Sequence, residues 1–216
     1  LERGYAISVR PLFLFAARLY PDDNPNDAAQ KAIAIILFKE EYRLIKRNPE
    51  FGMESRILLD KIDYKNKYFV LNGKKYELSI KDFPTIDPQD PFALTEDECA
   101  IIKNLRSSFI ESSQLRRHIQ FLYQKGSLYK CYNGNLLFHG CVPVDKEGRL
   151  KTIRLDGKNY SGRAYLDCVD QKIRQAYFGE RNQAATDFMW YLWCGINSPV
   201  SGRRMKIFER TFTLDK

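Results

Sequence analysis

The chain has 216 residues, of which 44% are hydrophobic and 13% aromatic, and a formal net charge of +8. This content excludes a disordered protein and suffices for a sizeable core, in one domain or two small ones. Its 27 acidic residues are interspersed with the basic ones, so the charge predicts no nucleic-acid partner. The five cysteines form no Cys-x-x-Cys pair and no apolar run reaches the roughly 18 residues of a membrane span, which is typical of a cytoplasmic protein without a membrane partner.

The first third of the chain is predicted to be mainly helical. Residues 8–20 are apolar and partly helical, and the proline- and aspartate-rich segment 21–26 interrupts them. A long helix follows from Asp27, its expected N-cap, to about Arg47. The Asn48-Pro49 pair ends it, because a residue before proline avoids the helical region.

Three β-hairpins are predicted from two-residue turn signals at Asn72-Gly73, Asn133-Gly134 and Asp156-Gly157. Their strands are expected at 67–71 with 74–78, 128–132 with 135–138, and 150–155 with 158–160.

The remaining segments favour further helices and one connector. Residues 83–91 hold three prolines and are the expected boundary between parts of the chain. Thr95 and Glu98 have capping-box spacing and open a helix that runs to about Ser107. Three later helices are predicted, from Ser112 or Ser113 to about 124, from about 163 to 178 and from about 186 to 193. The fold class is therefore α+β, helix-rich with short β-hairpins.

The stretch Asn135 to Pro143, NLLFHGCVP, is the strongest candidate site. Its apolar residues predict a short buried strand that ends at His139, and Gly140 would leave room for a ligand near the backbone. A strand holds an imidazole rigidly, as a metal or phosphate site requires. The residues alone nevertheless favour a structural histidine at this position. The other histidine, His118, is expected on a solvated helix face.

Five further segments carry a resemblance to a known family. They read KRNPEF at 46–51, LLDKIDY at 58–64, FPTIDP at 83–88, MWYLWCG at 189–195 and FER at 208–210. With the strand–His–Gly segment, they resemble the interior of a class III fructose-1,6-bisphosphatase, the large bacterial type within the calcineurin-like metallophosphatase superfamily.

The resemblance implies a hydrolase that converts fructose 1,6-bisphosphate to fructose 6-phosphate in gluconeogenesis by removing the 1-phosphate. It implies that His139 is a metal ligand and that two Mn²⁺ ions activate the attacking water. It also implies that residues 126–216 belong to a partial metallophosphatase core. Residues 1–125 are expected to be a mainly helical insert with a β-hairpin at about 67–78.

The family's other metal motifs, Asp-x-His, Gly-Asp-x-x-Asp, Gly-Asn-His and a late Gly-His, do not occur in this sequence. We therefore expect an internal fragment of a longer enzyme, without bound metal and without activity of its own. A second hypothesis is that the segment is a regulatory or oligomerisation insert that acts as a binding module. The oligomeric state stays open, with a homo-oligomer among the options.

A basic segment from Ser198 to Arg204 is the candidate for binding the sugar bisphosphate. Arg203 and Arg204 could form two-pronged hydrogen bonds to a phosphate group. A solvated basic turn explains the same residues equally well.

Overall fold

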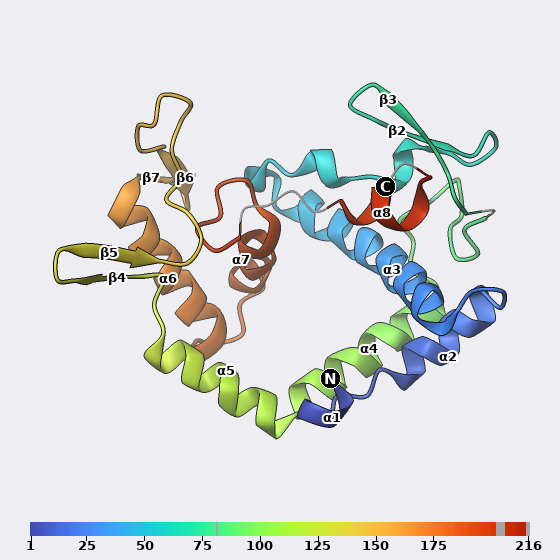
Figure 1. The fold of residues 1–216 in the computed structure, drawn as a ribbon, viewed down its shortest axis with the longest axis horizontal. Coiled ribbons are helices and arrows are strands. Elements are labelled where there is room, and N and C mark those ends of the chain that lie inside the picture. The colour runs from blue at the N-terminus through green and yellow to red at the C-terminus, as the bar shows by residue number, and fades with distance from the viewer. Residues whose placement is uncertain (81, 202–205, 215–216) are drawn as a thin grey trace. The chain divides into compact units, whose positions relative to one another are not determined.

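A computed structural model describes residues 1–80, 82–201 and 206–214. The chain forms two compact units, the first made of residues 1–118 and 206–216 and the second of residues 119–205 (Figure 1). Helices and small antiparallel sheets occur together, so the α+β prediction is confirmed at this level. Among the described residues, no helix combines the length and apolar character needed to cross a membrane.

The first unit is built around a long helix, α3 (Pro25–Arg47), which packs on α2 (Arg10–Leu19) and on α8 (Ile207–Phe212). Aromatic side chains fill the centre, with the ring of Phe208 at 5.6 Å from Phe38 and 4.3 Å from Phe69. The other elements of this unit are α1 (Glu2–Tyr5), α4 (Glu96–Glu111) and the 3-10 turns Pro49–Phe51, Glu54–Arg56 and Leu59–Lys61. The short helix α8 was not predicted from the sequence.

The N-cap of α3 is Asn24, so the prediction of Asp27 as cap is wrong. The Asn24 side chain accepts hydrogen bonds from the backbone N–H groups of Asn26 and Asp27, both at 3.1 Å. Pro25 occupies the first helical position, where its missing N–H costs nothing, and this sets the start three residues earlier. Asp27 lies in the first turn, where its charge is favourable to the helix dipole.

The capping box of α4 is confirmed and does more than cap the helix. The Thr95 hydroxyl accepts from the Glu98 N–H at 3.2 Å, and the Glu98 carboxylate accepts from the Thr95 N–H at 2.8 Å. That carboxylate is fully buried against Lys39 of α3, at 2.8 Å. Lys39 also donates to the Thr85 carbonyl at 2.6 Å. The segment 83–91 is thus tied into the first unit and is not a boundary between the two units.

A three-stranded antiparallel sheet completes the first unit, in the order β1 (Ile62–Asp63), β2 (Tyr68–Leu71) and β3 (Lys74–Glu77). Asn72 and Gly73 join β2 to β3 with φ of 52° and 77°. Two successive positive φ values are the signature of the tight turn predicted from Asn-Gly.

The described residues of the second unit form helices and two separate hairpins (Figure 1). The helices are α6 (Gly162–Phe178) and α7 (Gln183–Cys194), which pack on each other, and α5 (Ser113–Lys125) enters this unit from the first. The hairpins are β4 (Tyr129–Tyr132) with β5 (Asn135–Phe138), and β6 (Ile153–Leu155) with β7 (Lys158–Tyr160). All three turn-based predictions of hairpins are confirmed.

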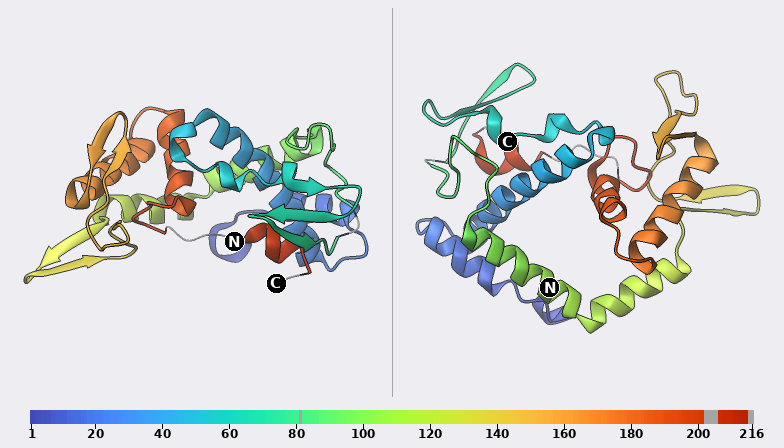
Figure 2. Two further views of the ribbon diagram at one scale, coloured as in Figure 1. Left: turned by 90° about the horizontal axis from the view of Figure 1, so that it is seen from above. Right: turned by 180° about the vertical axis from the view of Figure 1, so that it is seen from behind.

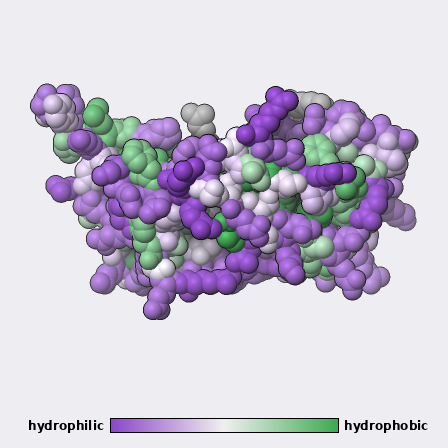
Figure 3. Space-filling view, turned by 90° about the horizontal axis from the view of Figure 1, so that it is seen from below, coloured by the Kyte–Doolittle hydropathy of each residue, from purple (hydrophilic) through white to green (hydrophobic). Residues whose placement is uncertain are grey.

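Residues 136–138 lie in a strand as predicted, but the prediction that this strand is buried is wrong. Leu136, Leu137 and Phe138 are 48%, 54% and 48% exposed. The β4–β5 hairpin projects from α6, and the described residues of the second unit place no further strand beside it (Figure 2). Hydrophobic side chains reach the surface elsewhere too (Figure 3). The second strand of the hairpin carries an apolar sequence, but in the described part of this unit its side chains stay largely exposed.

Candidate functional site

His139 lies directly after β5 and is exposed, in the strand-end position predicted for it. The structure explains the glycine at position 140 differently from the sequence, which suggested room for a ligand. A Cβ atom on Gly140 would lie 2.0 Å from the Pro199 carbonyl oxygen and 2.7 Å from the Val200 carbonyl oxygen. Glycine is therefore required here because another stretch of backbone lies against it.

The turn at His139 is also hydrogen-bonded to the start of the basic segment. The Cys141 N–H donates to the Pro199 carbonyl at 3.1 Å, and the Cys141 thiol contacts the Ser198 carbonyl at 3.2 Å. Two segments that the sequence offered as separate candidates thus meet at Gly140 and Cys141. The two predicted phosphate-binding residues, Arg203 and Arg204, lie outside the described residues.

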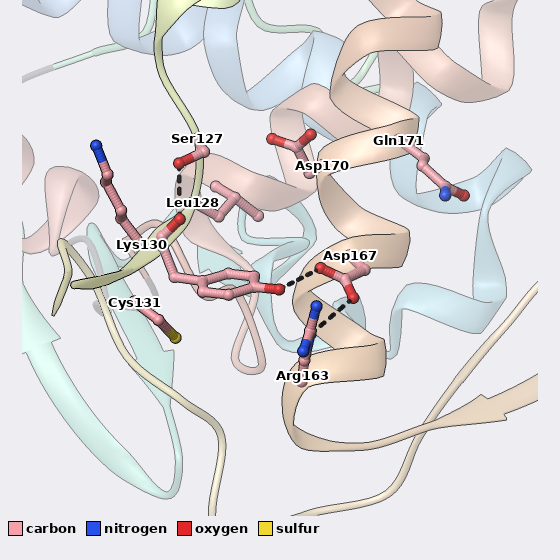
Figure 4. Close-up of a pocket in the computed structure, with 9 residues that line it drawn as sticks. Ser127, Leu128, Lys130, Cys131, Arg163, Asp167, Asp170 and Gln171 are labelled. Carbon is pink, nitrogen blue, oxygen red and sulfur yellow. Dashed lines mark hydrogen bonds and ion pairs between the residues drawn. The ribbon is translucent and has the colours of Figure 1, made fainter. Parts of the chain in front are cut away.

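A pocket of about 530 Å³ lies between β4 and α6. Figure 4 shows polar side chains converging on it from both elements. The hairpin register pairs Phe138 with Tyr129, so His139 follows at the same end of the hairpin as this pocket. The pocket is lined by Ser127, Leu128, Tyr129, Lys130, Cys131, Arg163, Asp167, Asp170 and Gln171.

The charges of this pocket are mixed. The Tyr129 hydroxyl donates to Asp167 at 2.7 Å, and the Arg163 guanidinium lies 3.5 Å from the same carboxylate. The hydrogen bond to Asp167 raises the pKa of Tyr129, because the phenol would lose its donor on ionisation. Asp170 is engaged by Arg174 at 2.7 Å. Both carboxylates are thus held by partners within the unit, and the lining carries the basic residues Lys130 and Arg163 beside them.

Arg174 also fixes the beginning of this region. Its guanidinium donates to the carbonyls of Gly126, at 2.9 Å, and of Tyr123 at the C-terminal end of α5. A cation on these carbonyls satisfies groups that a helix end leaves without intrahelical partners. The end of α5, and hence the start of β4, is anchored to α6.

The described residues do not form a metal site by themselves, because no group of three or more His, Cys, Asp or Glu among them could hold an ion. His139 is exposed and belongs to no such group. The other histidine, His118, is exposed on α5 with its Nδ1 3.2 Å from the Tyr5 hydroxyl, in agreement with the predicted helix-face position.

Sequence reasoning missed the pocket between β4 and α6. The i,i+4 pairs Arg163–Asp167 and Asp170–Arg174 could have been found from helical spacing. The contact of Tyr129 with Asp167 joins residues 38 positions apart, and no local pattern signals it.

Comparison with known proteins places the whole chain in one family. The model of the Firmicute fructose-1,6-bisphosphatase family matches residues 1–216. The chain is 44% identical over 240 aligned positions to the class 3 fructose-1,6-bisphosphatase of Clostridium novyi (strain NT), covering 100% of this chain and 36% of the relative. The corresponding protein of Clostridium botulinum (strain Langeland) is 43% identical with the same coverage.

The chain therefore spans about a third of the length of the curated relatives it matches. No solved structure matches it significantly. Its similarity to these relatives extends over both units, and the family match covers the described and the undescribed residues alike. On this evidence, the chain belongs to the Firmicute fructose-1,6-bisphosphatase family.

Proposed function

We propose that this chain is part of a phosphatase that removes the 1-phosphate of fructose 1,6-bisphosphate, in gluconeogenesis and in the cytoplasm. The observation that carries the proposal is the family match over residues 1–216. The relatives are named as fructose-1,6-bisphosphatases, and the chain is 44% identical to one of them.

The proposed role of the second unit is to contribute His139 as a ligand to Mn²⁺ within a calcineurin-like metallophosphatase core. The support is its position: the imidazole is exposed, follows a strand directly, and lies in a turn that other residues hold. Paired metal ions polarise phosphoryl oxygens and lower the pKa of a bound water. Because the described residues lack a metal-binding cluster, we assign the remaining ligands to the part of the relatives that this chain does not cover.

The exposed β4–β5 hairpin supports the same assignment. Its second strand carries three exposed apolar side chains, those of Leu136, Leu137 and Phe138. An isolated two-stranded hairpin is marginal in water, and unpaired strand edges readily accept another strand. We propose that the part of the fructose-1,6-bisphosphatase that this chain does not cover packs on these exposed side chains and thereby encloses the region next to His139.

Binding of the sugar bisphosphate is assigned to Arg203 and Arg204. The support is that Ser198 and Pro199, a few residues before them, contact the turn at His139. An arginine pair starting from this place could reach a phosphate near the imidazole.

The experiment compares this chain alone with a chimera in which it replaces the matching segment of the Clostridium novyi relative. Release of phosphate from fructose 1,6-bisphosphate is measured with and without Mn²⁺. We expect Mn²⁺-dependent turnover by the chimera and none by the chain alone. A folded chimera without turnover would refute the proposed function, and turnover by the chain alone would refute the assignment of the other ligands.

A further inference from the structure

A buried serine organises the loop that lies against the His139 turn. Ser198 follows α7 and has no exposed surface. Its hydroxyl donates to the Leu192 carbonyl at 2.6 Å and accepts from the N–H groups of Val200 and Ser201 at 3.1 and 3.3 Å. One donated and two accepted bonds use the full capacity of a hydroxyl. The segment 198–201 is therefore fixed to the last turn of α7.

The residue before Ser198 ties the same loop to α6. The hydroxyl of Tyr165, a fully buried residue of α6, donates to the Asn197 carbonyl at 2.8 Å. Lys151 donates to the Asn197 side chain at 2.8 Å. Held from two helices, this loop is a firm support for whatever packs on it.

The His139 turn packs on this support through backbone atoms. Gly140 presents its bare Cα to the Pro199 carbonyl, where a Cβ would come within 2.0 Å. Cys141 donates its N–H to the same carbonyl at 3.1 Å. His139 itself is exposed and directly precedes Gly140, so a displacement of this turn also displaces His139.

We infer that Gly140 and Ser198 are positioning residues for His139: Ser198 shapes the loop, and Gly140 lets the turn lie directly on it. This inference rests on the proposed role of His139 as a metal ligand. A ligand must be held within about 0.5 Å of its productive position, and a turn displaced by a Cβ contact would not meet that requirement. The structure thus assigns to Gly140 and Ser198 a role that acts through the backbone of the His139 turn.

The test uses the two histidines of the chain as reporters. His139 and His118 give separate ring C–H signals in a two-dimensional NMR spectrum, and His139→Ala assigns them. Gly140→Ala is compared with Gly4→Ala, a matched control because a Cβ on Gly4 would meet no atom within 4 Å. Ser198→Ala removes the hydroxyl alone. Amide hydrogen exchange at Cys141 reports directly on the bond to Pro199.

We expect Gly140→Ala and Ser198→Ala to move the His139 signal and leave that of His118 in place. Exchange at Cys141 should become at least about tenfold faster, because the protecting bond is lost by local opening. Gly4→Ala should change neither the His139 signal nor the exchange at Cys141. The Gly140 turn is exposed and can shift without unfolding the helices, so this variant decides the question even if Ser198→Ala does not fold.

An unchanged His139 signal with unchanged Cys141 exchange in folded Gly140→Ala would overturn the inference. In the active chimera, Gly140→Ala should raise the Mn²⁺ concentration needed for half-maximal rate at an unchanged melting temperature. A chimera without any activity refutes the proposed function instead, while the NMR comparison still decides whether the two residues position His139.

Discussion

Tyr165 shows how one buried residue links the stability of the second unit to pH. It has no exposed surface, and its hydroxyl donates to the Asn197 carbonyl at 2.8 Å. Burial is the main cause that raises the pKa of Tyr165, and burial likewise raises the pKa of the neighbouring Tyr191. A phenolate is poorly solvated in the protein interior, so the folded protein retains this proton to a higher pH than the unfolded chain does.

We therefore expect Tyr165→Phe to be less stable than the wild type at neutral pH and to approach the stability of the wild type in alkali. An unfolded tyrosine ionises near pH 10, so above that pH the unfolded state holds fewer protons and the stability due to Tyr165 declines until the folded pKa is reached. At pH 8 the variant should be less stable by about 1 kcal/mol, for the lost hydrogen bond. By pH 11 the difference should shrink by about 1 kcal/mol.

Urea unfolding of both proteins at the two pH values measures this difference, in which ionising groups that do not interact with Tyr165 cancel. If the gap between wild type and Tyr165→Phe is the same at pH 8 and pH 11, burial does not perturb this phenol.

At the scale of the elements, the buried pair Lys39–Glu98 joins α3 to the start of α4. Both side chains have no exposed surface, and the lysine Nζ lies 2.8 Å from the carboxylate. A buried ion pair contributes little compared with apolar residues, but removing one partner strands a charge in the core. Glu98 thus takes part both in the capping box and in the packing of the first unit.

Glu98→Gln should destabilise the first unit by about 3 kcal/mol, because Lys39 loses its counter-charge in the interior. Thr95→Ala removes only a capping bond and should cost about 1 kcal/mol. Denaturant unfolding of the two variants separates these contributions. Equal losses would show that the carboxylate serves as a cap alone.

The exposed hairpin and the helical core of the second unit should respond differently to truncation. Leu166→Ala, at a position 4% exposed, is expected to cost about 2–5 kcal/mol. Leu136→Ala, at a position 48% exposed, should cost less than about 1 kcal/mol. Chemical denaturation of this chain measures both. A comparable loss at Leu136 would mean that the hairpin is covered in solution.

Elements with local signals could be predicted from the sequence. The Asn-Gly and Asp-Gly turns, the capping box at Thr95 and the end of α3 at Asn48-Pro49 all depend on neighbouring residues, and each was found. The helix α8 could not, because it is short and its burial depends on contact with α3. An apolar run signals a strand, but the burial of β5 depends on what covers it.

The candidate site divides in the same way. The place of His139 at a strand end was predicted, since the hairpin turn fixes the register of β5. The constraint on Gly140 was not, because Pro199 is distant in sequence. Arg203 and Arg204 stay a prediction, as does the division into a helical insert and a metallophosphatase core.

At the scale of the whole molecule, we propose that this chain is one part of a larger phosphatase. The chain corresponds to 36% of its Clostridium novyi relative, and its described residues offer no metal-binding cluster. The described residues of the second unit include one exposed histidine, His139, and a hairpin with exposed apolar side chains. The two features lie next to each other in the sequence, which is why we expect a single interface to cover the hairpin and complete the site.

The most direct test of the central claim compares His139→Ala with His118→Ala in the Clostridium novyi chimera. Both histidines are exposed, so the free energy of unfolding of each variant should lie within about 0.5 kcal/mol of that of the parent. His139→Ala is expected to lower the rate on fructose 1,6-bisphosphate by several orders of magnitude at limiting Mn²⁺, since a metal ligand is lost. His118→Ala should retain the parent rate. A His139→Ala chimera that melts normally and turns over at near the parent rate under limiting Mn²⁺ would contradict the account.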